Sequence, residues 1–154
     1  MPIAYEYEDG SVYIVDVVFN KGDKTVTRPI VVGKLKRHLP HQVMFEANNG
    51  GDEYCDKVNE ELKKDNIRLH LSHRKAPSNQ SKLSRIIQAA PDIKTYYFLD
   101  KKYRSKEYAA FMKELTSFVQ TGKNKHDDAP DSLAMLSTLI NRRYGKVEAV
   151  KRPF

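Results

Sequence analysis

Residues 126–131 place one histidine and three aspartates directly ahead of an apolar run, in the string His-Asp-Asp-Ala-Pro-Asp. Two interpretations fit these residue types. Asp128 and Asp131 could cap a helix, because Asp at the cap, Pro130 in the first turn and an acid three residues later are ordinary helix start signals. Alternatively, the carboxylates bind a metal. The stretch alone favours capping, because such helix starts are far more common than metal sites.

A further carboxylate, Glu46, ends the apolar run Val-Met-Phe-Glu and precedes the turn Asn-Asn-Gly-Gly. Ligand sites in open α/β sheets gather at the carboxyl ends of strands, although an exposed strand-end residue is the ordinary alternative. Together with the acids of 126–131, Glu46 favours a site for hard divalent cations such as Mg²⁺, which prefer oxygen ligands. Two such ions about 4 Å apart can hold the attacking water and the leaving 3′ oxygen of a phosphodiester.

The elements that would position these side chains can be read from the spacing of apolar residues. Residues 2–7 and 11–19 resemble two strands of a hairpin, with Asp9-Gly10 in the turn. The pattern predicts further strands over 41–47, 68–74 and 96–99, and helices over 29–39, 54–66, 82–90, 107–119 and 130–144. This order predicts an α/β protein with a mixed sheet covered by helices.

Charge and length narrow the function classes. The 154 residues are the length of one domain, and the net charge is +7. Residues 1–60 hold 7 Lys/Arg and 10 Asp/Glu, whereas residues 61–154 hold 20 and 10, a net +10. That basic part, with its cluster at Arg74 and Lys75, is either a solvated surface or a binding surface for nucleic-acid phosphates.

Other sequence features limit the alternatives. The single cysteine, Cys55, excludes an internal disulfide and a Cys-based zinc site, so we expect a packing residue in a reducing compartment. No apolar run is long enough to span a bilayer, and residues 1–10 lack the pattern of a signal peptide, which predicts a soluble, intracellular protein without membrane partners. No P-loop occurs, because Thr-Gly-Lys-Asn-Lys at 121–125 lacks the earlier glycine and the later Ser/Thr.

The strings VMFEANNGG and HDDAPDSLAML, with SKLSRIIQAAPDIKTYYFLDKKYRSKEYAAFMKELTSF between them, resemble the C-terminal nuclease domain of the large terminase subunit of tailed bacteriophages. The resemblance extends from the first hairpin to about Tyr144. It implies an α/β fold with an RNase H-like mixed sheet flanked by helices, in one nuclease domain over 1–154 without an ATPase domain. It also implies a two-metal endonuclease that uses Mg²⁺ or Mn²⁺. Such an enzyme would cut concatemeric viral DNA during genome packaging, in the cytoplasm of a bacterial host.

The resemblance also implies roles for individual residues. Glu46, Asp127 and Asp128 would be the catalytic metal ligands, with Asp131 and His126 as auxiliary groups. Lys82 and Arg85 stand where the family carries basic residues, and we expect them to contact DNA phosphates together with Arg74 and Lys75. The implied partners are double-stranded DNA, the terminase ATPase domain, the small terminase subunit and the portal protein.

One part of the family pattern is missing. The family's first, central strand ends on an aspartate, and residues 1–154 begin at the strand that follows it. We therefore expect a sheet without that strand, either trimmed or completed by another chain. Asp16 is not an evident substitute, and we expect it to face a polar contact or solvent. The alternative function is a catalytically impaired nuclease-derived module that binds DNA or protein. Another RNase H-like nuclease, such as a resolvase or transposase, ranks last.

Overall fold

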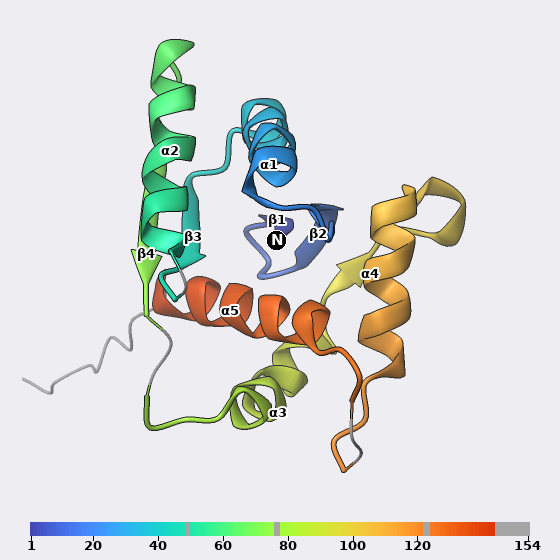
Figure 1. Ribbon diagram of the computed structural model, residues 1–154. Coiled ribbons are helices and arrows are strands. Elements are labelled where there is room, and N and C mark those ends of the chain that lie inside the picture. Colours follow the sequence, from blue (N-terminus) through green and yellow to red (C-terminus); the bar gives the residue numbers. More distant parts are fainter. Residues whose placement is uncertain (49, 76–77, 122–123, 144–154) are drawn as a thin grey trace, which may run out of the picture.

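The computed structural model describes residues 1–48, 50–75, 78–121 and 124–143, which form an α/β structure (Figure 1). Its elements, in chain order, are β1 (Pro2–Glu6), β2 (Val12–Val17), α1 (Lys24–His38), β3 (Gln42–Glu46), α2 (Gly51–Lys64), β4 (His70–Arg74), α3 (Lys82–Ile93), β5 (Tyr97–Phe98), a short 3₁₀ turn (Lys101–Tyr103), α4 (Lys106–Ser117) and α5 (Asp128–Arg143). None of the described helices is long and apolar enough to cross a membrane.

The first two strands form the expected hairpin. β1 and β2 pair antiparallel, and Gly10 takes a positive φ of 81° in the turn between them. Asp9 supports this turn because its carboxylate accepts a hydrogen bond from the Ser11 amide at 2.9 Å. β5 pairs parallel with β2, which gives a three-stranded sheet in the order β1-β2-β5.

A second sheet contains only β3 and β4, which pair in parallel with Glu46 opposite Arg74. Helix α2 covers this sheet through Val58 and Leu62, whose exposed fractions are both 0%. The mixed α/β class is thus confirmed. The expectation of one continuous sheet is not met, because the strands of the described residues form two separate sheets.

The main core joins the hairpin to the C-terminal helices. Tyr108 and Phe111 of α4 pack with Leu133 of α5 against β2, and all three are almost fully buried. The Tyr108 hydroxyl donates a 2.6 Å hydrogen bond to the Ile14 carbonyl oxygen, which satisfies its buried polar group. Figure 1 shows α5 passing beneath the strands, with α3 on its other side. This arrangement fixes the start of α5, where the aspartates lie.

Several helices begin earlier than the sequence indicated. Helix α1 starts at Lys24, not near Pro29, because the Asp23 carboxylate caps it by accepting from the amides of Thr25 and Val26. Pro29 therefore lies inside the helix. Likewise, α2 begins at Gly51 and α5 at Asp128.

Asp16 lies in β2 and faces helix α1. It accepts hydrogen bonds from Lys34 Nζ at 2.6 Å and His38 Nε2 at 3.1 Å, and its side chain is only 15% exposed. The expectation of a polar contact is confirmed. Burial alone would raise the pKa of Asp16, but the hydrogen bonds from Lys34 and His38 outweigh it and lower the pKa. Its carboxylate is therefore engaged by Lys34 and His38 of α1.

We expect Asp16→Asn to lower the free energy of unfolding by about 1–3 kcal/mol at pH 7, because it removes a half-buried charge partner of Lys34. A lowered folded-state pKa stabilises the protein above the unfolded pKa of about 4, and this contribution is lost as the pH falls further. Urea unfolding of both proteins from pH 7 to pH 3 should show the difference shrinking. Glu8→Gln, at an exposed position, is the control. A difference that grows at low pH would contradict the assignment.

Candidate functional site

The start of α5 is capped from a neighbouring helix. The Glu114 carboxylate of α4 accepts a hydrogen bond from the Ala129 amide at 2.8 Å, which satisfies one of the free amides at this helix terminus. A carboxylate also interacts favourably with the positive end of the helix dipole. The capping role proposed for Asp128 and Asp131 is thus taken by Glu114, and their own carboxylates bond to side chains of α3.

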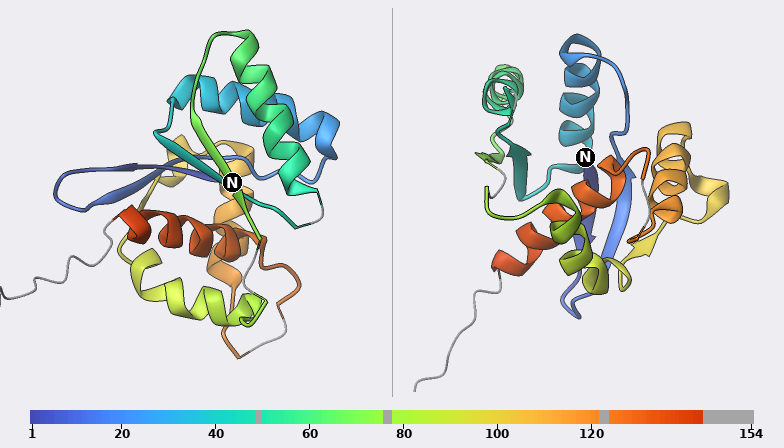
Figure 2. Two further views of the ribbon diagram at one scale, coloured as in Figure 1. Left: turned by 90° about the vertical axis from the view of Figure 1, so that its left-hand side faces the viewer. Right: turned by 60° about the horizontal axis from the view of Figure 1, so that its bottom comes forward.

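Helix α3 presents two cations to these acids. The Ser81 hydroxyl caps the helix by accepting a hydrogen bond from the Ser84 amide at 3.1 Å. Lys82 and Arg85 are three residues apart in this helix and therefore lie on the same face. Helix α3 packs against α5 (Figure 2). The ion pairs of Lys82 and Arg85 connect this face to the start of α5. The helix start therefore directs both cations toward Asp127, Asp128 and Asp131.

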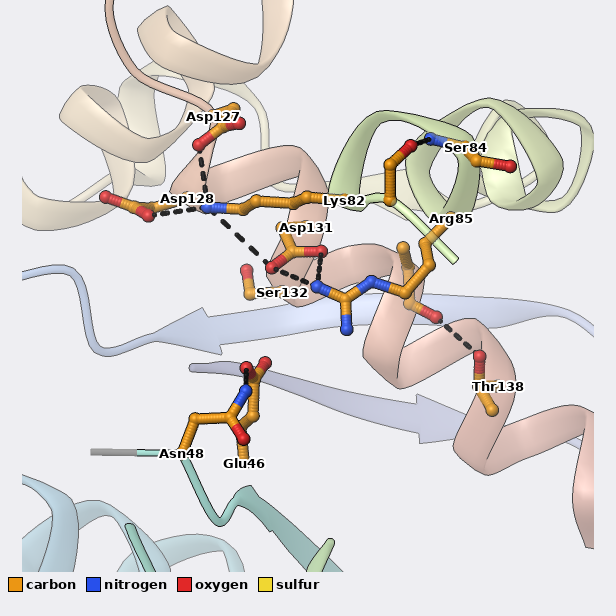
Figure 3. A network of polar contacts seen from close by, with 12 residues as sticks. Glu46, Asn48, Lys82, Ser84, Arg85, Asp127, Asp128, Asp131, Ser132 and Thr138 are labelled. Atoms are coloured by element: carbon orange, nitrogen blue, oxygen red, sulfur yellow. Dashed lines mark hydrogen bonds and ion pairs between the residues drawn. The ribbon is translucent and has the colours of Figure 1, made fainter. Parts of the chain in front are cut away.

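Lys82 binds all three aspartates. Its Nζ lies 2.6 Å from Asp127 Oδ1, 3.1 Å from Asp128 Oδ1 and 3.8 Å from Asp131 Oδ2 (Figure 3). Burial opposes the charged form of this lysine, but the hydrogen bonds to Asp127 and Asp128 outweigh that effect and raise its pKa. A single ammonium therefore partly neutralises three carboxylates.

Arg85 and Asp131 form the most buried ion pair of this cluster. Arg85 Nη2 lies 3.1 Å and 3.3 Å from the two Asp131 carboxylate oxygens, and the side chains are 16% and 11% exposed. Burial raises the pKa of Asp131 despite the charges of Arg85 and Lys82, and the nearby carboxylates of Glu46 and Asp127 raise it further. Glu46 is thus close enough to contribute to the raised pKa of Asp131, an acid 85 positions later in the chain.

Glu46 faces this cluster from the end of β3 (Figure 3). Its Oε1 accepts a 2.6 Å hydrogen bond from Asn48 Nδ2, which orients the carboxylate. The backbone of Gly51 lies very close to that of Glu46, since a Cβ added at Gly51 would lie 1.7 Å from the Glu46 carbonyl oxygen. Only glycine permits that close approach, so the glycine-containing turn fixes where the strand ends.

A cavity of about 360 Å³ adjoins Glu46 and Arg85. Two acids, Glu46 and Asp92, line it together with four cationic side chains, those of Arg74, Lys75, Arg85 and Arg142. The Arg85 Nε is buried and has no hydrogen-bond partner among the described residues. A buried donor without a partner is costly, and an anion beside it would remove that cost. The cavity thus offers several cationic side chains to an anionic group such as a phosphate.

Most of the site residues expected from the sequence come together. Lys82, Arg85 and the three aspartates form one cluster, which Glu46 faces, while Arg74 and Lys75 line the adjoining cavity at the end of β4. His126 is exposed next to this cluster, and among the described residues no contact of its side chain supports an orienting role. Lys82 and Arg85, expected to contact DNA phosphates, form ion pairs with the aspartates.

Sequence reasoning missed Glu114, Asn48 and Arg142. Glu114 lies on an amphipathic helix far from the aspartates in the chain, so no local pattern links it to the start of α5. Asn48 follows Glu46 by two residues, a spacing at which amide side chains commonly bond to nearby groups. That spacing could have identified it.

The carboxylates are the type of ligand that a hard divalent cation prefers, but their positions in this structure do not form a metal site. Carboxylate oxygens are the ligands that Mg²⁺ and Mn²⁺ prefer. Within the described part of the chain, however, no group of three or more His, Cys, Asp or Glu side chains is placed to hold a metal ion. The ammonium of Lys82 lies among the carboxylates that would have to converge. Comparisons with family models, curated proteins and solved structures found no match to the chain.

Proposed function

We propose that the chain is a divalent-metal-dependent DNA endonuclease domain of the terminase type. One observation carries the proposal: carboxylates from the end of β3 and the start of α5 face each other beside a cavity lined by cations. These groups come from positions 46, 74–85 and 127–142, so the arrangement is a product of the fold. A phosphodiester needs both features, namely acids to hold cations at the reacting phosphate and cations to hold the flanking phosphates.

In this proposal Glu46, Asp127 and Asp128 hold the metal ions, and Asp131 is an auxiliary acid kept in place by Arg85. Bound Mg²⁺ or Mn²⁺ would supply Lewis acidity toward the phosphate and lower the pKa of a water molecule. Lys82 holds the aspartates together in the metal-free chain. Asn48 keeps the Glu46 carboxylate turned toward the cluster by its hydrogen bond.

The cavity gives the DNA contacts. Arg74 and Lys75 at the end of β4, together with Arg142 of α5, would bind backbone phosphates next to the cut. Such contacts carry no sequence information but set the position of the duplex. Because they release counterions, affinity for double-stranded DNA should fall steeply with salt.

The proposal predicts that the chain nicks supercoiled plasmid in Mg²⁺ or Mn²⁺. Glu46→Ala and Asp128→Ala should each lower the nicking rate by at least about 100-fold, because each removes an acid that would ligate metal. Asp56→Ala, which removes an exposed acid of α2, is the matched control and should leave the rate unchanged. Nicking that survives in both site variants would refute the assignment of these acids.

A second candidate is a module that binds DNA without cutting it. The ion pairs of Lys82 favour it, since an ammonium already neutralises the carboxylates that a metal would need. This candidate predicts plasmid retardation at low salt that disappears at high salt, with no nicking in either metal. Binding that does not respond to salt would argue against both candidates.

The biological setting is part of the same proposal. By family resemblance the substrate would be concatemeric viral DNA in the cytoplasm of a bacterial host. The partners would be the terminase ATPase domain, the small terminase subunit and the portal protein. Cleavage of long linear DNA by a mixture of these components, and its loss without this chain, would test that setting.

A further inference from the structure

The cavity beside Glu46 is lined by apolar side chains as well as by cations. They come from three elements that are far apart in the chain, and are Met44 of β3, Ala89 of α3, and Ala134 and Met135 of α5. Ala89 and Ala134 are 8% and 4% exposed and belong to the small buried core between α3 and α5. Phosphates are charged, so contact with apolar side chains does not stabilise them. The apolar part of the lining therefore indicates a ligand that also has an apolar surface.

Amide side chains form another part of the lining, and they are those of Gln80, Gln88 and Asn141. Gln80 Nε2 donates a 2.7 Å hydrogen bond to Gln88 Oε1, and no other described residue bonds to either amide. The pair thus keeps free donors on Gln88 Nε2 and a free acceptor on Gln80 Oε1. Asn141 Nδ2 donates to Asp92 Oδ2 at 2.8 Å, which orients the Asn141 amide. Donors and acceptors together are what the edge of a nucleobase requires.

The size and charge of the cavity suit one nucleotide. Its volume of about 360 Å³ lies at the small end of the range for small-ligand sites, which is about 300–1,000 Å³. Arg74, Lys75 and Arg142 supply positive charge for a phosphate. The thioethers of Met44 and Met135 can make favourable contacts with an aromatic ring. A nucleotide combines a phosphate, a hydrogen-bonding edge and flat apolar faces, and the lining has a counterpart for each of them.

We propose that this cavity binds one unpaired nucleotide of the DNA, with the base against Met44 and Met135 and its edge at the Gln80–Gln88 pair. The inference rests on the proposed function, because the nucleotide belongs to the DNA bound there, and it adds the substrate class. Glu46 lines the same cavity, so the unpaired nucleotide lies next to the proposed site of cleavage. Taking a base out of a duplex costs free energy, and the cost is least for a base that is already unpaired. A duplex with an extrahelical nucleotide is therefore preferred over a perfect duplex.

The test measures binding without cleavage. Fluorescence anisotropy in EDTA gives the affinity of the whole chain for three labelled duplexes of the same sequence. The first is fully paired, the second has one bulged deoxyadenosine, and the third has an abasic residue in place of that deoxyadenosine. We expect the bulged deoxyadenosine to raise the affinity at least about tenfold over the paired duplex. The abasic bulge interrupts the duplex at the same position but has no base, so it should bind like the paired duplex.

A double variant tests the contacts to the base. Gln80→Ala combined with Gln88→Ala removes the amide pair, and we expect it to reduce the preference for the bulged deoxyadenosine to less than about threefold. Neither residue is buried, so the variant should fold, and its circular dichroism spectrum checks this. Gln120→Ala removes an exposed amide that does not line the cavity and should keep the full preference.

The outcomes separate this inference from the proposed function. Equal, salt-dependent affinity for the bulged and paired duplexes would overturn the nucleotide site and leave the proposed DNA contacts in place. A preference that is the same for the deoxyadenosine and abasic bulges would also overturn it, because the base would then play no part. A preference that survives in the double variant would locate the recognition of the base outside this cavity, with the same consequence. No binding of any duplex at low salt would overturn both the inference and the proposed function.

Discussion

Replacing Arg85 with methionine is expected to lower the free energy of unfolding by about 3–5 kcal/mol, because it leaves the buried Asp131 carboxylate without its closest cation. The two side chains are 16% and 11% exposed, so water cannot compensate for the lost partner. Lys82 remains, but its Nζ lies 3.8 Å from Asp131 and is held by two other carboxylates. Urea unfolding followed by circular dichroism measures the change.

The double variant separates the pair from the fold. Arg85→Met combined with Asp131→Leu removes both charges and should recover most of the lost stability, since apolar replacement of a buried pair is often neutral. Lys106→Met, at an exposed position on α4, controls for the loss of a basic residue. A loss below about 1 kcal/mol for Arg85→Met, the range of an exposed pair, would show that Asp131 is not held as described.

The second large effect concerns cation binding. Lys82→Met should raise the affinity of the chain for Mn²⁺ at least about tenfold, because the ammonium that now lies among three aspartates would no longer compete with the metal. Two unit charges about 4 Å apart interact by about 1 kcal/mol in water and about 4 kcal/mol near a protein surface, and a tenfold change needs only about 1.4 kcal/mol. Titration calorimetry measures the affinity.

Lys125→Met provides the matched control, since Lys125 is exposed and close in the chain to the aspartates. It should change the affinity much less than Lys82→Met. Unchanged or weaker binding in Lys82→Met would mean that the lysine organises the carboxylates for the metal instead of competing with it. Comparison of the two variants at equal ionic strength removes the general effect of net charge.

The sequence predicted the element types, because these depend on local patterns. The Asp9-Gly10 turn, the amphipathic helix containing Tyr108 and Phe111, and the strand that ends on Glu46 were all correctly placed. The boundaries were less accurate. Helix α1 begins five residues before Pro29 because the capping bonds of Asp23 outweigh the loss of one amide donor inside the helix.

Contacts between distant segments were not predictable from such patterns. The cap of α5 comes from Glu114, and Lys82 and Arg85 turn toward the aspartates instead of outward. Both outcomes depend on how α3, α4 and α5 pack against each other. The division into two sheets also follows from packing, since the strand patterns alone do not say which edges pair.

We propose that Glu46 and the aspartates at the start of α5 form one divalent-cation site. The most direct test is paramagnetic broadening of backbone amide signals in the ¹⁵N-labelled chain during Mn²⁺ titration. We expect the amide signals of 46–48 and 127–131 to broaden together at low Mn²⁺ concentration. We also expect Glu46→Ala to weaken this broadening in both segments. Broadening confined to one of these segments, or spread over exposed acids such as Asp56, would contradict the account.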